Sequence, residues 1–335
     1  MLNSQMEYAI LIVLLALLFD TVLGEPPHPL HPVVWMGGLI AFLDRKIPRG
    51  NEKLEKILGV FLGMIPIFLF TFTLTLLLAI ARKHIGTVAW LIASALLFKT
   101  TFAVKSMHQH ALPILEYLSK GDIENARKRV AMMVSRNVKS LDREHIISAA
   151  IESISENIVD GITSPCFFLG IGGIPIAITY RVINTLDAMV GYQNNKYKNV
   201  GWFSAKLDDL ANWFTARFTV FFIALAALLL RKNWRLSIRV AMQHHGRTRS
   251  PNSGWPIAAM AGALNIKLEK INQYVIGEGM LPRDPQMIQE ALKIMKISSL
   301  LFLFFTVLPL YIFLGIHVQL ILENFFYDLI WGAYT

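Results

Sequence analysis

The sequence predicts an all-α polytopic membrane protein with about five to six membrane segments, one of them broken or re-entrant. Of its 335 residues, 54% are hydrophobic and only 16% are charged, whereas soluble domains carry about 25% charged residues. The mean hydropathy is +0.49. Uncharged apolar runs long enough to cross about 30 Å of hydrocarbon also recur along the chain.

Six apolar segments account for the predicted spans. The runs at 57–80 and 297–316 contain no charged residue, and those at 88–104 and 216–230 each contain one basic residue. The first run has no Lys or Arg before it and no A-x-A site after it, so we expect a retained anchor and not a cleaved signal peptide. In chain order the six are 8–20, 57–80, 88–104, 161–180, 216–230 and 297–316.

The fourth segment, 161–180, is uncharged but contains the Gly- and Pro-rich stretch LGIGGIP. A backbone broken in this way is tolerated at membrane depth only where protein or a water-filled cavity satisfies its polar groups. We therefore expect this segment to be buried in protein or to enter and leave on one side of the membrane.

The basic residues indicate membrane contact and not a nucleic-acid partner. The net charge is +9 and the pI is about 9.6, but Lys and Arg flank the apolar segments. Such residues orient spans and attract anionic lipid headgroups. We expect a multi-pass protein of the cell membrane with no nucleic-acid partner.

The main polar loops are expected at 25–56, 105–160, 184–211 and 231–296. Six spans with both termini outside put three of these loops in the cytoplasm, as their Lys and Arg content favours. Six spans also put the loop 184–211 on the outer side of the membrane, although its lysines favour the cytoplasm. The number of crossings therefore stays open. The rest of the pattern is helical, without strands, repeats or a long linker, and predicts one helical membrane domain over residues 1–335.

Three carboxylates precede the fourth apolar segment in the stretch AAIESISENIVDGITSPCFF. Glu152, Glu156 and Asp160 are spaced four apart, so on an α-helix they share one face and repel one another. No basic residue lies between them. We therefore expect a cationic group from elsewhere against this face, which could be a metal ion, an arginine or an amine substrate; a solvated acidic face is the alternative.

A second polar stretch runs from 180 to 214 and mixes acids, amides and bases. Its aromatic residues are expected to be interfacial anchors. Arg and Lys suit phosphate, while carboxylates suit Mg²⁺ or an ammonium group. The stretch therefore predicts a site for a highly polar ligand, and its candidates are Arg181, Asn184, Asp187, Lys206, Asp208 and Asp209.

Two further stretches are distinctive. SPNSGWP, at 250–256, combines turn residues with the start of a small-residue helix, where backbone N–H groups can hold an anion. FDTVLGEPPHPLHPVVWMGGLI places Asp20 at the end of a span, before a Pro-rich turn with His28 and His31. No P-loop, dinucleotide-binding or nucleophile-elbow motif is present, and the histidines lack zinc-like spacing.

Four stretches together resemble one family, the CbiB/CobD cobalamin biosynthesis membrane proteins, which are adenosylcobinamide-phosphate synthases. The resemblance covers most of the chain and keeps the family order. The stretches are FDTVLGEPPHPLHPVVWMG, SRNVKSLDREHIISAAIESISENIVDGITSP, YRVINTLDAMVGYQNNKYKNVGWFSAKLDDLANW and SPNSGWPIAAMAGAL. The chain departs from the family pattern with Asn137 where Asp is usual after Arg, and with Glu25 where Asp is usual.

The resemblance implies an amide-forming ligation. The propionate carboxylate of adenosylcobyric acid would be joined to (R)-1-aminopropan-2-ol or its O-phosphate, with ATP as the driving force and Mg²⁺ alongside it. It also implies that the product passes to other membrane-bound enzymes of cobalamin assembly. A related branch serves β-lactamase regulation, but the stretches NTLDAMVGY and KLDDLANW resemble the synthase branch.

The candidate residues fit such chemistry in three roles. Glu152, Glu156 and Asp160 would hold Mg²⁺ or take a proton from the attacking amine. The expected phosphate ligands are Arg136, Arg181 and Lys206, the expected corrin-amide partners are Asn157, Asn184 and Asn252, and the second candidates for metal or amine are Asp187, Asp208 and Asp209. Two rivals remain, a membrane transporter and a non-catalytic scaffold or sensor of the same superfamily.

Overall fold

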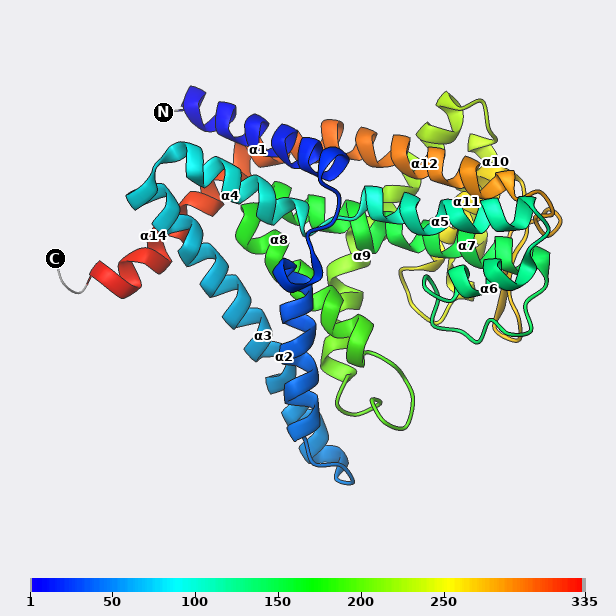
Figure 1. Cartoon of the computed structure of the whole chain (residues 1–335), viewed down its shortest axis with the longest axis horizontal. Helices are drawn as coiled ribbons and strands as arrows, with labels where there is room; N and C mark the ends of the chain where they lie inside the picture. Colours follow the sequence, from blue (N-terminus) through cyan, green and yellow to red (C-terminus); the bar gives the residue numbers. More distant parts are fainter. Residues whose placement is uncertain (1, 333–335) are drawn as a thin grey trace. The chain divides into compact units, whose positions relative to one another are not determined.

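The computed structural model describes residues 2–332, and most of this range is helical (Figure 1). The helices are α1 (Leu2–Val22), α2 (Pro32–Lys46), α3 (Glu52–Ile80), α4 (Thr87–Lys99), α5 (Val104–Ser119), α6 (Ile123–Val130), α7 (Arg143–Ile158), α8 (Ser164–Val190), α9 (Trp202–Leu229), α10 (Trp234–His244), α11 (Gly254–Leu264), α12 (Gln286–Phe302), α13 (Leu308–Leu310) and α14 (Ile316–Trp331). A π-helical turn at Ala81–Ile85 follows α3 and ends at Gly86, and single π-helical turns interrupt the other long helices at Val159–Thr163, Leu303–Val307 and Tyr311–Gly315.

Within the described range, six helical stretches are long and apolar enough to cross a membrane. They are Ser4–Val22, Glu52–Ile85, Thr87–Ser119, Arg143–Val190, Trp202–Leu229 and Gln286–Trp331. Five of the six predicted segments lie within one of them, and the remaining segment, 216–230, exceeds Trp202–Leu229 by one residue. The predicted class, an all-α multi-pass membrane protein, is confirmed.

The expected break in the fourth segment is present in α8. Gly173 has a φ of +70° and interrupts the helical backbone just before Pro175. The N–H group of Ile174, which follows the break, donates to Oε1 of Gln319 at 3.2 Å. A glutamine side chain from α14 thus satisfies a backbone group that lipid could not satisfy.

One detail of the sequence-based interpretation was wrong. A two-stranded antiparallel hairpin, β1 (Leu268–Lys270) and β2 (Tyr274–Ile276), lies in a region expected to be helical. Three-residue strands are too short to leave a two-residue alternation in the sequence.

The chain divides into two compact units, each built from separate stretches of sequence. The first unit comprises Met1–Ala103, Pro165–Ala211 and Phe304–Thr335, and the second comprises Val104–Ser164 and Asn212–Leu303. Of α9, residues 202–211 are assigned to the first unit and 212–229 to the second, whereas α8 after Ser164 belongs to the first. The single domain expected over 1–335 therefore stays a prediction.

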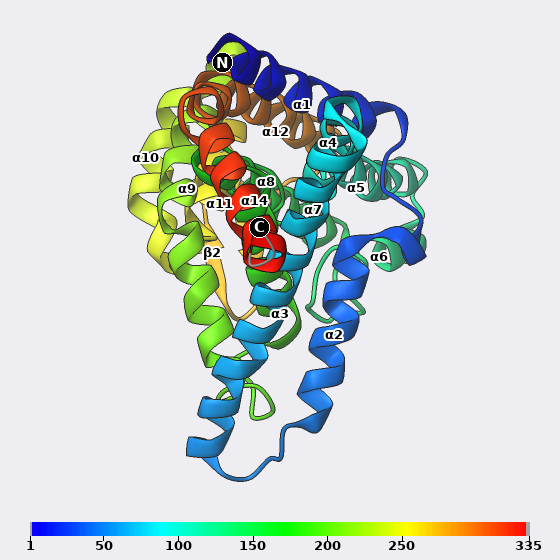
Figure 2. The same cartoon turned by 90° about the vertical axis from the view of Figure 1, so that its left-hand side faces the viewer.

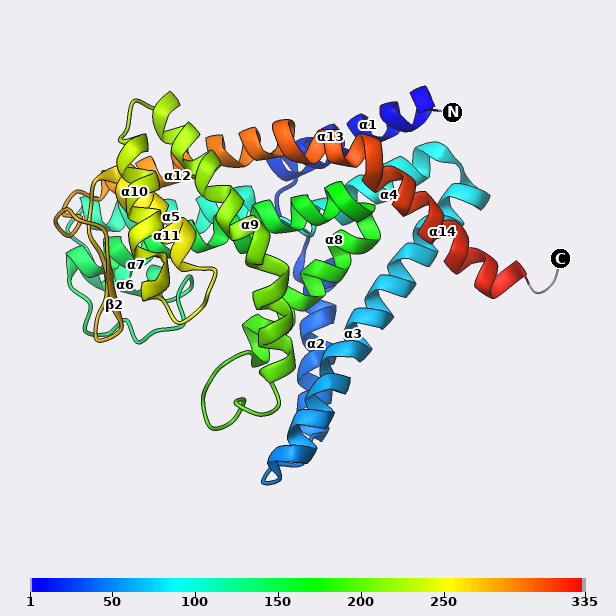
Figure 3. The same ribbon diagram turned by 180° about the vertical axis from the view of Figure 1, so that it is seen from behind.

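In the first unit, α1 packs against α4 and α14 packs against α3 (Figures 2 and 3). Glu323 on α14 is fully buried and accepts hydrogen bonds from Trp90 and Gln319, both at 2.9 Å. Nε of Arg82 completes the set at 2.8 Å from the same carboxylate. These partners compensate for removing an ionised group from water, which is otherwise costly.

In the second unit, α7 is the central helix and packs against α5, α6, α11 and α12. The small residues of α11 let it approach α10 closely, as Figure 3 shows. A side chain at Gly262 would collide with the carbonyl of Leu236, and Ser237 Oγ donates to the carbonyl of Ala259 at 2.8 Å. Close approach through small residues is typical of helix pairs in membranes.

Candidate functional site

A small polar cavity in the second unit contains two of the three acids singled out above. Its volume is about 220 Å³. The walls come from α7, from the segment that follows α6, and from the β1–β2 hairpin. The lining residues are Met133, Val134, Ser135, Arg136, Glu152, Ser153, Glu156, Lys270 and Tyr274, and we call this the Glu152 cavity.

Glu152 is buried and held by three partners. Arg136 lies 3.0 Å from its Oε2, the hydroxyl of Tyr274 donates to the same oxygen at 2.7 Å, and Ser148 Oγ donates to Oε1 at 2.9 Å. The expected cationic partner of this acid is therefore an arginine. With its charge neutralised and both oxygens occupied, Glu152 organises the cavity wall.

Glu156 lies one helical turn further along α7 and is partly exposed to the cavity. Its carboxylate interacts electrostatically with Glu152, Lys270 and Arg136. Two acids, two bases and a phenol thus surround a space that would hold a small molecule. Such a lining is complementary to a ligand that itself carries both a positive and a negative group.

The hairpin brings Lys270 and Tyr274 to the cavity because they are directly paired across its two strands. Asn272 occupies the tight turn between them with a φ of +60°, a conformation that asparagine tolerates better than most residues. The hairpin is fixed to α7 by the N–H group of Glu269, which donates to Ser148 Oγ at 2.8 Å. The serine therefore links the strand to Glu152.

Asp160, the third acid, does not share this wall. It lies in the π-helical turn Val159–Thr163, which has more residues per turn than an α-helix and shifts the spacing of four off the common face. Within the described chain, the lining of the Glu152 cavity includes Glu152 and Glu156 but not Asp160. Asn157 uses its amide N–H to donate to the carbonyl of Ser153 at 2.9 Å.

Tyr274 provides a pH-dependent test of this geometry. Burial and the charges of Glu152 and Glu156 raise the pKa of its phenol above the ordinary value of 10.0. A raised pKa in the folded state contributes stability below about pH 10, which is lost as the pH rises beyond it. We expect unfolding midpoints of the wild type to fall more steeply above about pH 10 than those of Tyr274→Phe. Parallel pH profiles for the two proteins would contradict this geometry.

A second polar cluster lies in the first unit, on α8 and the start of α9. Arg181 donates to Oδ1 of Asn184 at 3.3 Å, and Nδ2 of Asn184 donates to Asp208 at 3.4 Å. Asp187 interacts electrostatically with Asp209, and Lys206 lies 3.8 Å from Asp209. The six candidates of the stretch 180–214 are therefore neighbours in this unit. They form two groups, one in which Asn184 links Arg181 to Asp208 and one in which Asp209 lies between Asp187 and Lys206.

A cavity of about 300 Å³ adjoins this cluster, and we call it the Asp209 cavity. Its walls combine two lysines, one acid and three aromatic residues. The lining residues are Gly191, Tyr192, Gln193, Tyr197, Lys198, Gly201, Trp202, Ala205, Lys206 and Asp209.

Asn252, the remaining candidate, is buried in the second unit outside the Glu152 cavity. Its Oδ1 accepts a hydrogen bond from Arg217 at 3.3 Å. The same guanidinium lies over the rings of Trp213 and Trp255. In the stretch 250–256, where an anion cradle was expected, backbone N–H groups are already bonded within the turn: those of Asn252 and Ser253 donate to Ser250 Oγ, and that of Trp255 donates to the carbonyl of Asn252.

The comparisons with known proteins agree with this arrangement of motifs. The family model described as "CobD/Cbib protein" matches residues 13–304. The chain belongs to the CobD/Cbib family. No solved structure matches the chain.

Relatives named for cobalamin biosynthesis match this CobD/Cbib chain over most of their length. The "Probable cobalamin biosynthesis protein CobD" of Methanothermobacter thermautotrophicus is 41% identical over 87% of this chain and 94% of its own. The "Cobalamin biosynthesis protein CobD" of Dehalococcoides mccartyi is 36% identical over 90% and 97%. That of Klebsiella pneumoniae is 37% identical over 77% and 82%.

The sequence resemblance implies Mg²⁺, and this CobD/Cbib chain has carboxylates that could hold it. The described part of the chain has no cluster of three or more His, Cys, Asp or Glu side chains that could hold a metal by themselves. Mg²⁺ in nucleotide sites commonly uses only one or two carboxylates, with phosphates and water as the other ligands. One or two carboxylates are available at Asp209, which lies near Asp187 and follows Asp208 in the chain.

Sequence reasoning missed Lys270, Tyr274 and Ser148. The first two lie on strands of three residues, and the serine is one of several small polar residues along α7. The one feature of the sequence that could have indicated the hairpin is the placement of Lys270 and Tyr274 on either side of Asn272. A lone Asn without Gly is only a weak signal for a hairpin turn. Their roles depend on where the hairpin docks.

Proposed function

We propose that this CobD/Cbib protein is an adenosylcobinamide-phosphate synthase. It would join the propionate carboxylate of adenosylcobyric acid to aminopropanol or its O-phosphate in an ATP-dependent amide ligation. The observation that carries the proposal is the Glu152 cavity, where Glu156 faces two basic side chains in a small polar space. We further propose that the protein works in the cell membrane and passes its product to other membrane-bound enzymes of cobalamin assembly.

The Glu152 cavity suits the amine substrate in both size and charge. A volume of about 220 Å³ is below the roughly 300–1,000 Å³ of sites for drug-sized ligands, so it excludes a corrin ring. Arg136 and Lys270 supply donors for a phosphate or hydroxyl group. Glu156 supplies the negative charge that an ammonium group requires.

Glu156 would also act as the general base. The ammonium form of the amine has no lone pair, so it must lose a proton before its nitrogen can attack an acyl carbon. One C–N bond forms, one carboxylate oxygen leaves with phosphorus derived from ATP, and nitrogen loses two protons overall. Glu152 is already neutralised by Arg136, so its role would be to position that arginine and Tyr274.

The Asp209 cavity is the better candidate for the nucleotide. Lys198 and Lys206 suit phosphate oxygens, and the rings of Tyr192 and Tyr197, 6.4 Å apart, offer flat faces to a base. Asp209, with Asp187 or Asp208, would hold Mg²⁺, which when bound would neutralise phosphate charge. Arg181 and Asn184 support Asp208 through hydrogen bonds, and Asn157 and Asn252 stay candidates for the amides of the corrin.

A single assay tests the proposal against its two rivals. Purified protein in detergent is incubated with adenosylcobyric acid, aminopropanol phosphate and Mg-ATP, and the corrinoid is analysed by mass spectrometry. A ligase increases the mass of the corrinoid by that of the amine less one water, and it does so only with ATP. Neither a transporter nor a scaffold produces this mass, and a corrinoid left unchanged under all conditions would contradict the proposal.

Asp209→Asn is expected to raise the Mg²⁺ concentration that gives half-maximal ligation by about tenfold, the effect of losing roughly 1.4 kcal/mol of binding. The reason is that an amide oxygen carries no net charge to attract the cation. The measurement is ligation rate against Mg²⁺ at saturating ATP. Asp328→Asn, which alters an exposed acid of the same unit, serves as the control. Identical Mg²⁺ curves for Asp209→Asn and this control would remove Asp209 from the metal site.

A further inference from the structure

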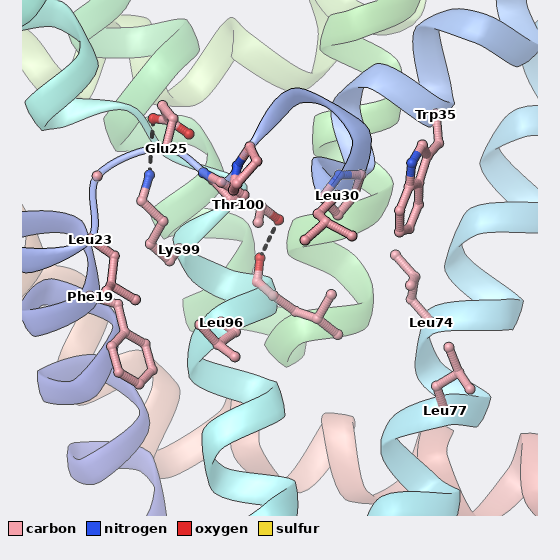
Figure 4. A pocket seen from close by; sticks show the side chains of 15 residues that line it. Phe19, Leu23, Glu25, Leu30, Trp35, Leu74, Leu77, Leu96, Lys99 and Thr100 are labelled. Carbon is pink, nitrogen blue, oxygen red and sulfur yellow. Dashed lines mark hydrogen bonds and ion pairs between the residues drawn. The ribbon is translucent and has the colours of Figure 1, made fainter.

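The largest of the three cavities described here is apolar and lies in the first unit, with a volume of about 630 Å³. Figure 4 shows its walls, which come from α1, the following loop, α2, α3 and α4. The apolar lining includes Phe19, Leu23, Trp35, Leu74, Leu77 and Leu96. We call it the Leu74 cavity.

The rim of the Leu74 cavity belongs to the surface that faces lipid. Leu77 on α3 and Leu96 on α4 line the cavity, yet they are 53% and 41% exposed. Both lie within candidate membrane spans. Exposed leucines in a spanning helix contact hydrocarbon, so the cavity opens toward the lipid chains.

One end of the Leu74 cavity is charged, as the upper left of Figure 4 shows. The side chain of Lys99 is only 3% exposed and lies 3.2 Å from Asp20 and 2.9 Å from Glu25. His31 Nε2 lies 3.0 Å from the other oxygen of Glu25. Asp20 and Glu25 carry two negative charges and Lys99 carries one positive charge, so the net charge of this group is negative when His31 is neutral.

Glu25 keeps its charge in this setting. Burial alone raises the pKa of its carboxyl, but hydrogen bonds from His31 and Lys99 and the charge of Lys99 lower it below the ordinary value of 4.5 overall. An ionised Glu25 beside the cavity repels an anionic group and attracts an ammonium group.

We propose that the Leu74 cavity binds one chain of a membrane lipid whose headgroup carries an ammonium group. The cavity combines an apolar body with a polar end, and it opens where lipid chains are already present at high concentration. Its volume lies within the roughly 300–1,000 Å³ of small-molecule sites. The bound chain would fill space between α1, α3 and α4, and the headgroup would lie near Glu25.

Native mass spectrometry of lipid retained by the full chain tests the proposal. The protein is reconstituted in vesicles of equal parts phosphatidylethanolamine and phosphatidylglycerol, then extracted again in detergent. We expect the wild type to retain phosphatidylethanolamine in preference to phosphatidylglycerol. Leu77→Trp and Leu96→Trp, which place a larger side chain in the cavity, should each lower the lipid-bound fraction about tenfold, as a loss of roughly 1.4 kcal/mol would.

Leu69→Trp is the matched control, because Leu69 is also on α3 and is 45% exposed but does not line the cavity. It should retain lipid like the wild type, and circular dichroism should show all variants equally helical. Glu25→Gln should keep the lipid but lose the preference for phosphatidylethanolamine. A lipid-free wild type, filling variants that retain as much lipid as Leu69→Trp, or preferential retention of phosphatidylglycerol would each overturn the proposal.

Discussion

Glu156→Gln is expected to lower the ligation rate by about 10²–10⁴-fold, the usual contribution of a positioned general base. The substitution keeps the size and hydrogen-bonding capacity of the side chain but removes its ability to accept a proton from the ammonium group. It also removes the negative charge that attracts that group into the Glu152 cavity. The measurement is the initial rate of corrinoid product over a range of amine concentrations.

Glu144→Gln is the control for this loss. Glu144 lies on α7 as well, but it is not among the residues that line the cavity, and it pairs with the exposed Arg283 at 3.0 Å. Glu144→Gln should keep the ligation rate within about twofold of the wild-type rate, since exposed ion pairs contribute little to stability. Retention of full activity by Glu156→Gln would exclude Glu156 as the base, even if the protein proves to be the proposed ligase.

Glu323→Leu should give the largest loss of stability, about 3–5 kcal/mol in the free energy of unfolding. The carboxylate is fully buried and accepts from Arg82, Trp90 and Gln319. Leucine removes the acceptor of the buried Trp90 and Gln319 donors and the ion pair of Arg82, which keeps only its hydrogen bond to Asn324. The measurement is the unfolding midpoint in a titration with a denaturing detergent.

Asp328→Asn separates this effect from a general loss of acidic residues on α14. Asp328 forms an ion pair with Lys83 at 3.2 Å, but its side chain is 63% exposed. Its replacement should cost less than about 1 kcal/mol. Equal losses for the two variants would show that the Glu323 network contributes no more than a surface pair.

The fold class was accessible from the sequence because membrane spans depend on composition over a short window. About 30 Å of hydrocarbon requires a run of about 20 apolar residues, whatever the rest of the chain does. The break at Gly173 was accessible for the same local reason, since neighbouring glycines and a proline disrupt a helix wherever they occur. Its partner, Gln319, was not accessible, because 145 positions separate it from Ile174.

The candidate site was predicted in part. Spacing placed Glu152 and Glu156 on one face correctly, because α7 is regular between them. Asp160 does not line the cavity with them, and it lies in the π-helical turn Val159–Thr163, which changes the number of residues per turn. Arginine was one of three cations expected opposite the acids, and only the structure identifies Arg136 as that group for Glu152.

The sequence by itself determined that this chain is a helical membrane protein of the CobD/Cbib family with acids near the start of its fourth apolar segment. Those features depend on neighbours in the chain, which hydropathy and motif order record. The tertiary structure alone decided which acid is neutralised, which faces a cavity, and that Tyr274 and Lys270 complete the Glu152 cavity. The reason is that a hairpin of two three-residue strands acquires its role from the helix face on which it docks, and residues more than 100 positions apart meet there.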